Sequence, residues 1–198
     1  MQPRMIYLAS ASPRRSELLR QIDVAHVVKP VDIDESPRPA EQPAHYALRL
    51  AEEKARALWE RLPATERLPV LAADTTVALG DEILGKPADR TDAARILGRL
   101  SGVAHEVHTA VAFLHADGAD ARVSTSTVTF RALTPDEIDW YWDTGEPADK
   151  AGAYAVQGHG AIFIRHLAGS YSGVMGLPLY ETWELVAPVL GLAGRSRA

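Results

Sequence analysis

Two adjacent arginines, Arg14 and Arg15, lie where the sequence predicts that a helix begins. Pro13 suits the first helical position because it has no N–H to leave unpaired, and Ser12 is expected to cap the helix through its hydroxyl. Basic side chains in a first turn oppose the helix dipole, whereas phosphate is favoured there and guanidinium groups bind it in a fork. The stretch therefore predicts a phosphate site. The alternative is a capping serine followed by two solvated arginines.

An acidic loop further along the chain offers oxygen atoms to a cation. Asp32, Asp34 and Glu35 stand close together, just before prolines that prevent an immediate helix. Such a group of carboxylates is usually a solvated turn. It also suits Mg²⁺, which takes a few carboxylates together with substrate phosphates, so both interpretations stay open.

A carboxylate and an ammonium follow the next predicted strands. Asp74 comes directly after the apolar run 68–73, and catalytic acids often lie at the carboxyl end of such a strand. An aspartate that caps a turn is the alternative. The runs 77–79 and 82–84 predict a hairpin that leads to Lys86. This lysine is either placed to meet phosphate or is an isolated surface lysine, and its surroundings lack the glycine spacing of a Walker A loop.

Two glycine-rich stretches complete the candidate features. The block 149–160 has too much glycine for a packed element, so its backbone must approach another group closely or turn sharply. A ligand cleft and a surface turn explain it equally well. A second such loop spans 169–178.

Helices and strands that would position these residues alternate along the chain. Strands are predicted at 5–9, 25–28, 68–73, 77–79, 82–84, 107–115, 122–131 and 161–167. Helices are predicted at 13–22, 42–61, 91–100 (capped by Thr91), 134–142 (opened by a capping box from Thr134 to Glu137) and 179–190, with a frayed tail from Gly191. The charged residues of 42–61, Lys54 among them, are expected to form a solvated helix face.

Composition limits the classes of protein to which the chain can belong. Its 198 residues can bury a sizeable core, as one domain or two small lobes. A net charge of −5 gives no general attraction to nucleic acid or acidic lipid, and the lack of cysteine excludes disulfides, thiol nucleophiles and cysteine-ligated metals. No apolar run is long enough to cross a bilayer, and the first residues lack the apolar core of a signal peptide. A cytoplasmic protein is expected, and His105 and His108 are not expected to bind metal.

Four stretches taken together resemble the Maf family of nucleotide pyrophosphatases, the septum-formation inhibitor proteins. They are Ser10–Arg15, Ala73-Asp74-Thr75, Gly85-Lys86-Pro87, and Asp149–Gln157 with Gly176-Leu177-Pro178-Leu179. The resemblance extends over nearly the whole chain in family order, with Leu100-Ser101-Gly102 and His105 in place. It implies a single α/β domain over residues 1–198, with a mixed central β-sheet flanked by helices. The implied fold is like that of the inosine triphosphate pyrophosphatases, with two lobes around a nucleotide cleft.

The resemblance also implies an activity and assigns residues to it. The activity is hydrolysis of a nucleoside triphosphate to the monophosphate and pyrophosphate, with a divalent cation, Mg²⁺ or Mn²⁺. Asp74 resembles the proton acceptor that activates water, and Glu35 resembles an acidic residue that holds the metal together with Asp74. Arg15 and Lys86 resemble phosphate contacts with a catalytic role, and Ser10 lies in the same substrate-binding loop.

The base specificity that the resemblance implies is for dTTP and UTP. The subgroup with that preference carries Asp-Thr after its strand and a glutamine after Gly-Ala-Tyr, and Arg14, Thr75 and Gln157 occupy its specificity positions. A glutamine amide offers both a donor and an acceptor to a pyrimidine edge. Two departures from the family pattern, Thr76 for a branched apolar residue and Ala155 for glycine, remove no functional group.

Two other functions stay open. One is the 7-methyl-GTP activity of another subgroup, which Thr75 and Gln157 disfavour. The other is a nucleotide-binding regulator of cell division. The resemblance also implies a homodimer. Nucleic-acid binding is not expected, because the chain is acidic and has no basic stripe interleaved with aromatic residues.

Overall fold

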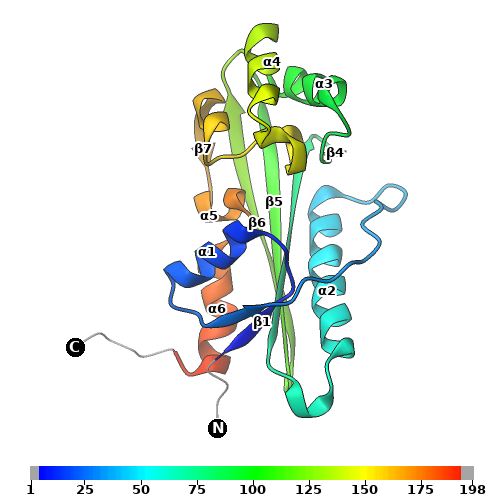
Figure 1. Cartoon of the computed structure of the whole chain (residues 1–198), viewed down its shortest axis with the longest axis vertical. Coiled ribbons are helices and arrows are strands. Elements are labelled where there is room, and N and C mark those ends of the chain that lie inside the picture. The colour runs from blue at the N-terminus through cyan, green and yellow to red at the C-terminus, as the bar shows by residue number, and fades with distance from the viewer. Residues whose placement is uncertain (1–4, 193–198) are drawn as a thin grey trace, which may run out of the picture.

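A computed structural model describes residues 5–192 and shows an α/β fold built on a seven-stranded mixed sheet (Figure 1). The sheet order is β2-β1-β3-β5-β6-β7, with β4 paired to β3. The strands are β1 (Ile6–Leu8), β2 (His26–Val28), β3 (Val70–Leu79), β4 (Glu82–Leu84), β5 (Ala104–His115), β6 (Gly118–Phe130) and β7 (Ile164–Ala168). The helices are α1 (Pro13–Gln21), α2 (Pro43–Arg61), α3 (Arg90–Leu100), α4 (Pro135–Asp143), α5 (Tyr171–Met175) and α6 (Leu179–Leu190). The predicted mixed-sheet α/β fold is confirmed.

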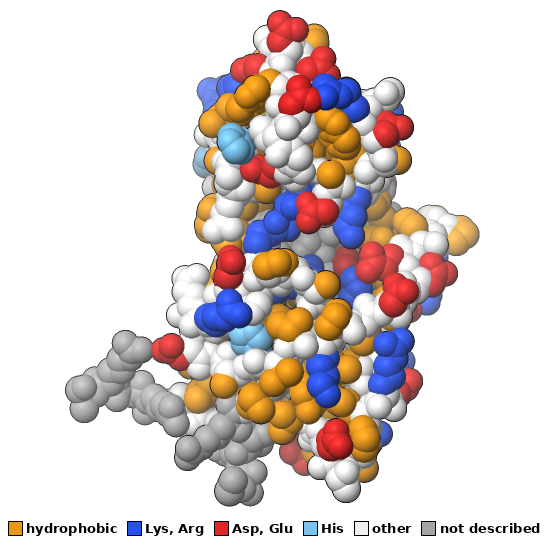
Figure 2. Space-filling view, in the orientation of Figure 1, with side chains coloured by type: hydrophobic (Ala, Val, Ile, Leu, Met, Phe, Trp, Pro, Cys, Tyr) orange, Lys and Arg blue, Asp and Glu red, His pale blue; other side chains and the backbone are white. Residues whose placement is uncertain are grey.

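The long strands β3, β5 and β6 run the length of the molecule and carry packed side chains at both ends. The lower half in Figure 1 contains β1, β2, α1, α2 and α6, and the upper half contains β4, α3, α4 and the segment 146–163. A space-filling view shows a hollow at mid-height, between these two halves (Figure 2).

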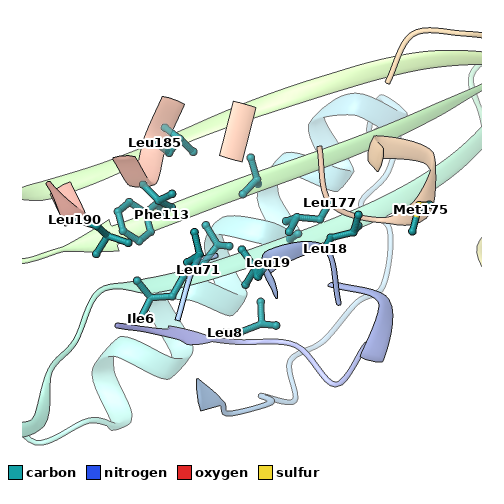
Figure 3. Packing of buried hydrophobic residues seen from close by; sticks show 14 of the residues in the cluster. Ile6, Leu8, Leu18, Leu19, Leu71, Phe113, Met175, Leu177, Leu185 and Leu190 are labelled. Carbon is teal, nitrogen blue, oxygen red and sulfur yellow. The ribbon is translucent and has the colours of Figure 1, made fainter. Parts of the chain in front are cut away.

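Side chains alternate between the two faces of the sheet along β3. Leu71 and Phe113 pack on one face with α1, α5 and α6 (Figure 3), whereas Val70 packs on the other face against Ala51 and Leu58 of α2. This alternation decides which helix each polar residue of β3 meets. The upper half has its own cluster, in which Phe130, Tyr141 and Phe163 are fully buried or nearly so.

A gap in strand pairing opens one edge of β3. The parallel strand β1 pairs with β3 only at Val70 and Leu71, and β4 pairs with it only from Val77 onward. Between them, residues 72–76 have a strand partner in β5 alone among the residues that the structure describes. The backbone of the Asp74 region is therefore uncovered on one side, where a ligand can approach.

The prediction that Asp74 follows the end of a strand is wrong. Strand β3 continues to Leu79, and β5 pairs with it in antiparallel register from Val70 to Ala78. Thr75 and Thr76 are β-branched and suit an extended strand. The neighbouring strand that ends in this region is β1, which leaves the sheet after Leu8, the residue paired with Leu71.

Several local predictions are confirmed and others are corrected. The capping box at Thr134 and Glu137 is present, and the hairpin turns at Gly80-Asp81. Ser12 does precede α1, but its hydroxyl makes no capping bond, and its amide donates to Ser10 Oγ instead. The cap of α3 is Asp89 rather than Thr91, because the Asp89 carboxylate reaches the Asp92 amide.

The remaining boundaries differ by a few residues. Strand β7 begins at Ile164, since His159–Phe163 forms a 3-10 turn, and β5 and β6 begin at Ala104 and Gly118. The predicted tail beyond Leu192 and the signal-peptide region 1–4 lie outside the described residues. Within residues 5–192, no helix combines the length and apolar character that a membrane crossing requires.

Candidate active site

The hollow at mid-height is a cleft of about 580 Å³ at the open edge of β3. Lys and Arg side chains gather around it in the space-filling view (Figure 2). Every residue that the sequence predicted for the site lines this cleft: Ser10, Arg14, Arg15, Glu35, Asp74, Thr75, Lys86 and Gln157. Segments far apart in the chain thus contribute to one cavity.

Arg15 lies in the first turn of α1, and three acceptors hold its guanidinium. Its Nε donates to the Gly176 carbonyl at 2.8 Å, one terminal nitrogen donates to Ser10 Oγ at 3.0 Å and the other lies 3.4 Å from Thr75 Oγ1. A guanidinium has five N–H donors, so each terminal nitrogen keeps one for a ligand. Burial lowers the pKa of Arg15 although the Asp74 carboxylate opposes that shift, and the group stays charged at neutral pH.

Thr75 faces the same side of the sheet as Arg15, as the strand alternation requires. Its hydroxyl lies 3.0 Å from the hydroxyl of Thr109, its directly paired residue on β5, and Thr109 in turn donates to the Gly173 carbonyl at 2.7 Å. Gly176 has a φ of +118°, a conformation that side chains rarely adopt. The backbone at Gly176 can therefore turn its carbonyl toward Arg15.

Asp74 faces the opposite side of the sheet and meets Lys54 of α2. The Lys54 ammonium donates to Asp74 Oδ1 at 2.7 Å and lies 2.6 Å from Glu35 Oε1. The side chains of Lys54 and Asp74 are each 11% exposed, whereas Glu35 is 45% exposed. One buried cation thus joins the two carboxylates that were predicted to hold a metal.

The prediction of a solvated Lys54 is wrong. Leu50, Lys54 and Leu58 are spaced by four residues and form the buried stripe of α2. The expectation of a solvated face considered only the charge of this helix. The spacing of Lys54 relative to Leu50 and Leu58 would have predicted its burial, and a lysine inside an apolar helical stripe needs a carboxylate partner.

Burial and charge shift the two carboxylates in opposite directions. Desolvation raises the pKa of Asp74 above its ordinary value, although the positive charges of Lys54 and Arg15 act against this rise. For Glu35, desolvation also acts upward, but the hydrogen bond and charge of Lys54, together with the charges of Lys86 and Arg15, outweigh it and lower the pKa. Asp74 is therefore the better proton acceptor of the pair.

The loop that carries Glu35 is tied to α2 by polar contacts. Tyr46 donates its hydroxyl to the Glu35 carbonyl at 2.7 Å, and desolvation, with the Asp74 and Glu35 charges, raises the Tyr46 pKa to about 12. Arg49 donates to both carboxylate oxygens of Glu41, at 2.6 and 2.7 Å, and to the Ser36 carbonyl at 3.2 Å. These contacts hold Glu35 near Lys54.

Three predicted site residues keep their polar ends available to a ligand. Within the described part of the chain, the side chains of Arg14, Lys86 and Gln157 form no hydrogen bond or ion pair. Lys86 is close enough to Glu35 for its charge to lower the pKa of that carboxyl. The cleft thus has cationic groups on both halves and an amide at its rim.

The sequence of the chain matches the model of one protein family over most of its length. The sequence model of the family described as Maf-like protein matches residues 5–189 of this chain. The chain belongs to the Maf family. The Maf resemblance of the sequence motifs is therefore confirmed over nearly the whole described chain.

Relatives of this Maf chain carry a common name. A Methylobacillus flagellatus protein named dTTP/UTP pyrophosphatase is 55% identical over 181 residues, covering 91% of this chain and 90% of the relative. A Bordetella avium protein of the same name is 53% identical over 187 residues, covering 91% and 93%. The solved structure of the Staphylococcus aureus Ham1 protein aligns over 95% of both chains at 14% identity, with a TM-score of 0.46.

Proposed function

We propose that this Maf chain hydrolyses dTTP and UTP to the nucleoside monophosphate and pyrophosphate. The observation that carries the proposal is that one cleft holds a buried carboxylate, Asp74, opposite a guanidinium, Arg15, that keeps free donors. Relatives that are 50–55% identical are named for the same activity. A triphosphate needs a base for water on one side and positive charge for its phosphates on the other.

The positive groups would bind the phosphates and stabilise the leaving pyrophosphate. Arg15 is fixed in orientation by its three acceptors, so its two remaining N–H donors are presented to a ligand without further ordering. Lys86 adds a second charge from a different element, the loop after β4. Negative charge grows on the pyrophosphate oxygens as the α–β bond breaks, and fixed cations stabilise it most at that moment.

Asp74 would take the proton from the attacking water. Its raised pKa brings it nearer to the working pH, which favours a general base. Lys54, held between the two carboxylates, orients Asp74 and prevents it from turning away. Ser10 acts on the substrate through Arg15, since its hydroxyl accepts from that guanidinium.

The residues fit the divalent cation that the resemblance implies. Glu35 and Asp74 both reach one ammonium within 2.7 Å, so their carboxylates are close enough to share a cation, and oxygen donors suit Mg²⁺ and Mn²⁺. When bound, such an ion neutralises phosphate oxygens and acidifies water. In the structure, Lys54 compensates the negative charge of these two carboxylates. We propose that Glu35 and Asp74 hold the metal when the nucleotide binds.

Base recognition is proposed for Thr75, Arg14 and Gln157, in line with the specificity positions of the subgroup. The Gln157 amide has no partner among the described residues and can meet both a donor and an acceptor of a pyrimidine. A site built to satisfy such polar edges rejects a wrong base strongly. We also propose that the protein is a cytoplasmic homodimer, which light scattering in solution and cell fractionation would test.

The test is pyrophosphate release from dTTP, UTP, CTP, GTP and 7-methyl-GTP, with Mg²⁺ or Mn²⁺ and with EDTA. We expect fast release from dTTP and UTP that EDTA abolishes and added metal restores. A preference for 7-methyl-GTP would contradict the roles of Thr75 and Gln157. Turnover unaffected by EDTA would contradict the metal proposal, and turnover of none of the five would contradict the enzyme.

A further inference from the structure

The glycine-rich block 149–160 folds against a buried tyrosine–glutamate pair in the upper half. A Cβ at Gly160 would lie 2.5 Å from the Ala155 carbonyl oxygen and 2.6 Å from the Tyr141 hydroxyl. A Cβ at Gly158 would lie 2.3 Å from Glu146 Oε2, and the φ of Gly158 is +100°. These glycines are therefore explained by close approach to Tyr141 and Glu146.

The side chains of Tyr141 and Glu146 accept hydrogen bonds from backbone amides at two places in the block 149–160. The Tyr141 hydroxyl accepts from the Ala155 amide at 3.1 Å and donates to Glu146 Oε1 at 2.7 Å. Glu146 then accepts from the Gly160 amide at 3.0 Å and from the His159 amide at 2.9 Å. A single hydrogen-bonded pair thus fixes both ends of the segment 155–160.

Gln157 lies between these two attachments, and its side chain forms no hydrogen bond with any residue of the described range 5–192. Tyr141 has 0% exposure, and its ring packs edge-on against Phe163 at a centroid distance of 5.0 Å. The side chain of Glu146 is only 16% exposed. Rigid attachment points on both sides restrict where the exposed Gln157 amide can point, as precise recognition requires.

We propose that Tyr141 and Glu146 are positioning residues for base recognition, which act on the nucleotide through the backbone of Gln157. The inference rests on the proposed function, because it concerns how that site selects a pyrimidine. Neither residue lines the cleft. Their effect is expected on nucleotide binding and selectivity, whereas Asp74, on β3, carries the chemical step independently.

Tyr141→Phe removes only the hydroxyl that links Ala155 to Glu146 and keeps the buried ring. A misplacement of about 1 Å can cost about 100-fold, so we expect kcat/KM for UTP to fall by about 10- to 100-fold, mainly through KM. The preference for UTP over CTP should fall with it. Tyr180→Phe is the matched control, because it deletes a Tyr–Glu hydrogen bond to Glu184 on a tyrosine that is 72% exposed on α6.

A double-mutant cycle with Gln157→Ala separates positioning from general loss of structure. If Tyr141 acts through Gln157, Tyr141→Phe adds little in the Gln157→Ala background. An equal loss in both backgrounds, or a fall in kcat with KM unchanged, would overturn the inference. Glu146→Gln, measured in the same way below its melting temperature, provides the second variant and should shift KM in the same direction.

The wild-type protein separates the two proposals. A wild type without preference for dTTP and UTP contradicts the proposed function. A wild type that has this preference, and keeps it in both Tyr141→Phe and Glu146→Gln, contradicts the inference alone.

Discussion

Replacing Asp74 by asparagine should slow turnover by several orders of magnitude and leave the fold intact. Asparagine keeps the size of the side chain but cannot accept the proton of water. General base catalysis contributes about 10²–10⁴-fold, or about 3–5 kcal/mol of activation free energy, and we expect kcat/KM for dTTP to fall by that factor. KM should change less than kcat, because Arg15, Lys86 and Glu35, the other proposed metal ligand, are all retained.

Two opposing effects on the free energy of unfolding leave it nearly unchanged. Burial raises the pKa of Asp74, so its ionised form is less favourable in the folded chain than in the unfolded one, and removing the charge relieves this. The variant amide oxygen can still accept from Lys54, but a charge-assisted bond of about 1.5–3 kcal/mol becomes a weaker one. Lys54 also keeps Glu35 at 2.6 Å. We expect a net change within about 1 kcal/mol, or about 2–4 °C in Tm.

The assay combines pyrophosphate release with thermal unfolding followed by circular dichroism. Asp81→Asn, the same change at the exposed hairpin turn, is the control and should alter neither quantity. If Asp74→Asn keeps more than about a tenth of wild-type kcat/KM, general base catalysis by this carboxylate is refuted. A fall in Tm above about 8 °C would instead show that the Lys54–Asp74 pair is needed for folding.

Three further predictions concern the phosphate site, the glycine block and a buried histidine. Arg15→Lys keeps the charge but loses the planar fork, so we expect kcat/KM for dTTP to fall about 10- to 100-fold in steady-state assays; an unchanged kcat/KM would contradict its role. Gly160→Ala should lower the free energy of unfolding by about 1–3 kcal/mol through overpacking. Gly98→Ala, with open space in a helix, should raise it by about 0.4–1 kcal/mol. Denaturant titration measures both, and equal effects would disprove the packing argument. Burial lowers the pKa of His105 to about 4. As the pH falls below 6.5, this histidine therefore binds a proton in the unfolded chain before it does so in the folded one. The free energy of unfolding decreases down to about pH 4, by about 3 kcal/mol at most. His105→Gln should remove that part of the pH dependence of Tm, and a variant with the wild-type pH dependence would count against it.

Motif residues could be predicted from sequence because each carries its own chemical signal. Arg15 stands in a helical first turn where a basic residue requires an anion, and Lys86 follows a hairpin with a clear turn. The resemblance then joined them to Asp74 and Gln157, and the structure places all four along one cleft. Their roles in catalysis and recognition stay predictions.

Partners across long sequence separations could not be predicted from a single sequence. The length of β1 determines where its pairing with β3 ends. No residue type within 70–79 indicates that this pairing ends at Leu71. The Lys54 contact depends on which face of β3 meets α2. The Tyr141–Glu146 pair was missed because its partners are backbone amides, which carry no residue-type signal.

The long strands have a consequence for how the two halves of the molecule can move. Strand β3 places Leu71 in the lower core and Val77 in the upper core, and β5 does the same with Phe113 and Val107. Hinge closure would have to bend hydrogen-bonded strands of 10, 12 and 13 residues together. The spacing between the lower and upper halves on either side of the cleft is thus fixed by the continuous strands of the sheet when the chain folds. Substitutions in the loops that line the cleft would then change its side chains and leave unchanged the spacing that the sheet sets between the two halves.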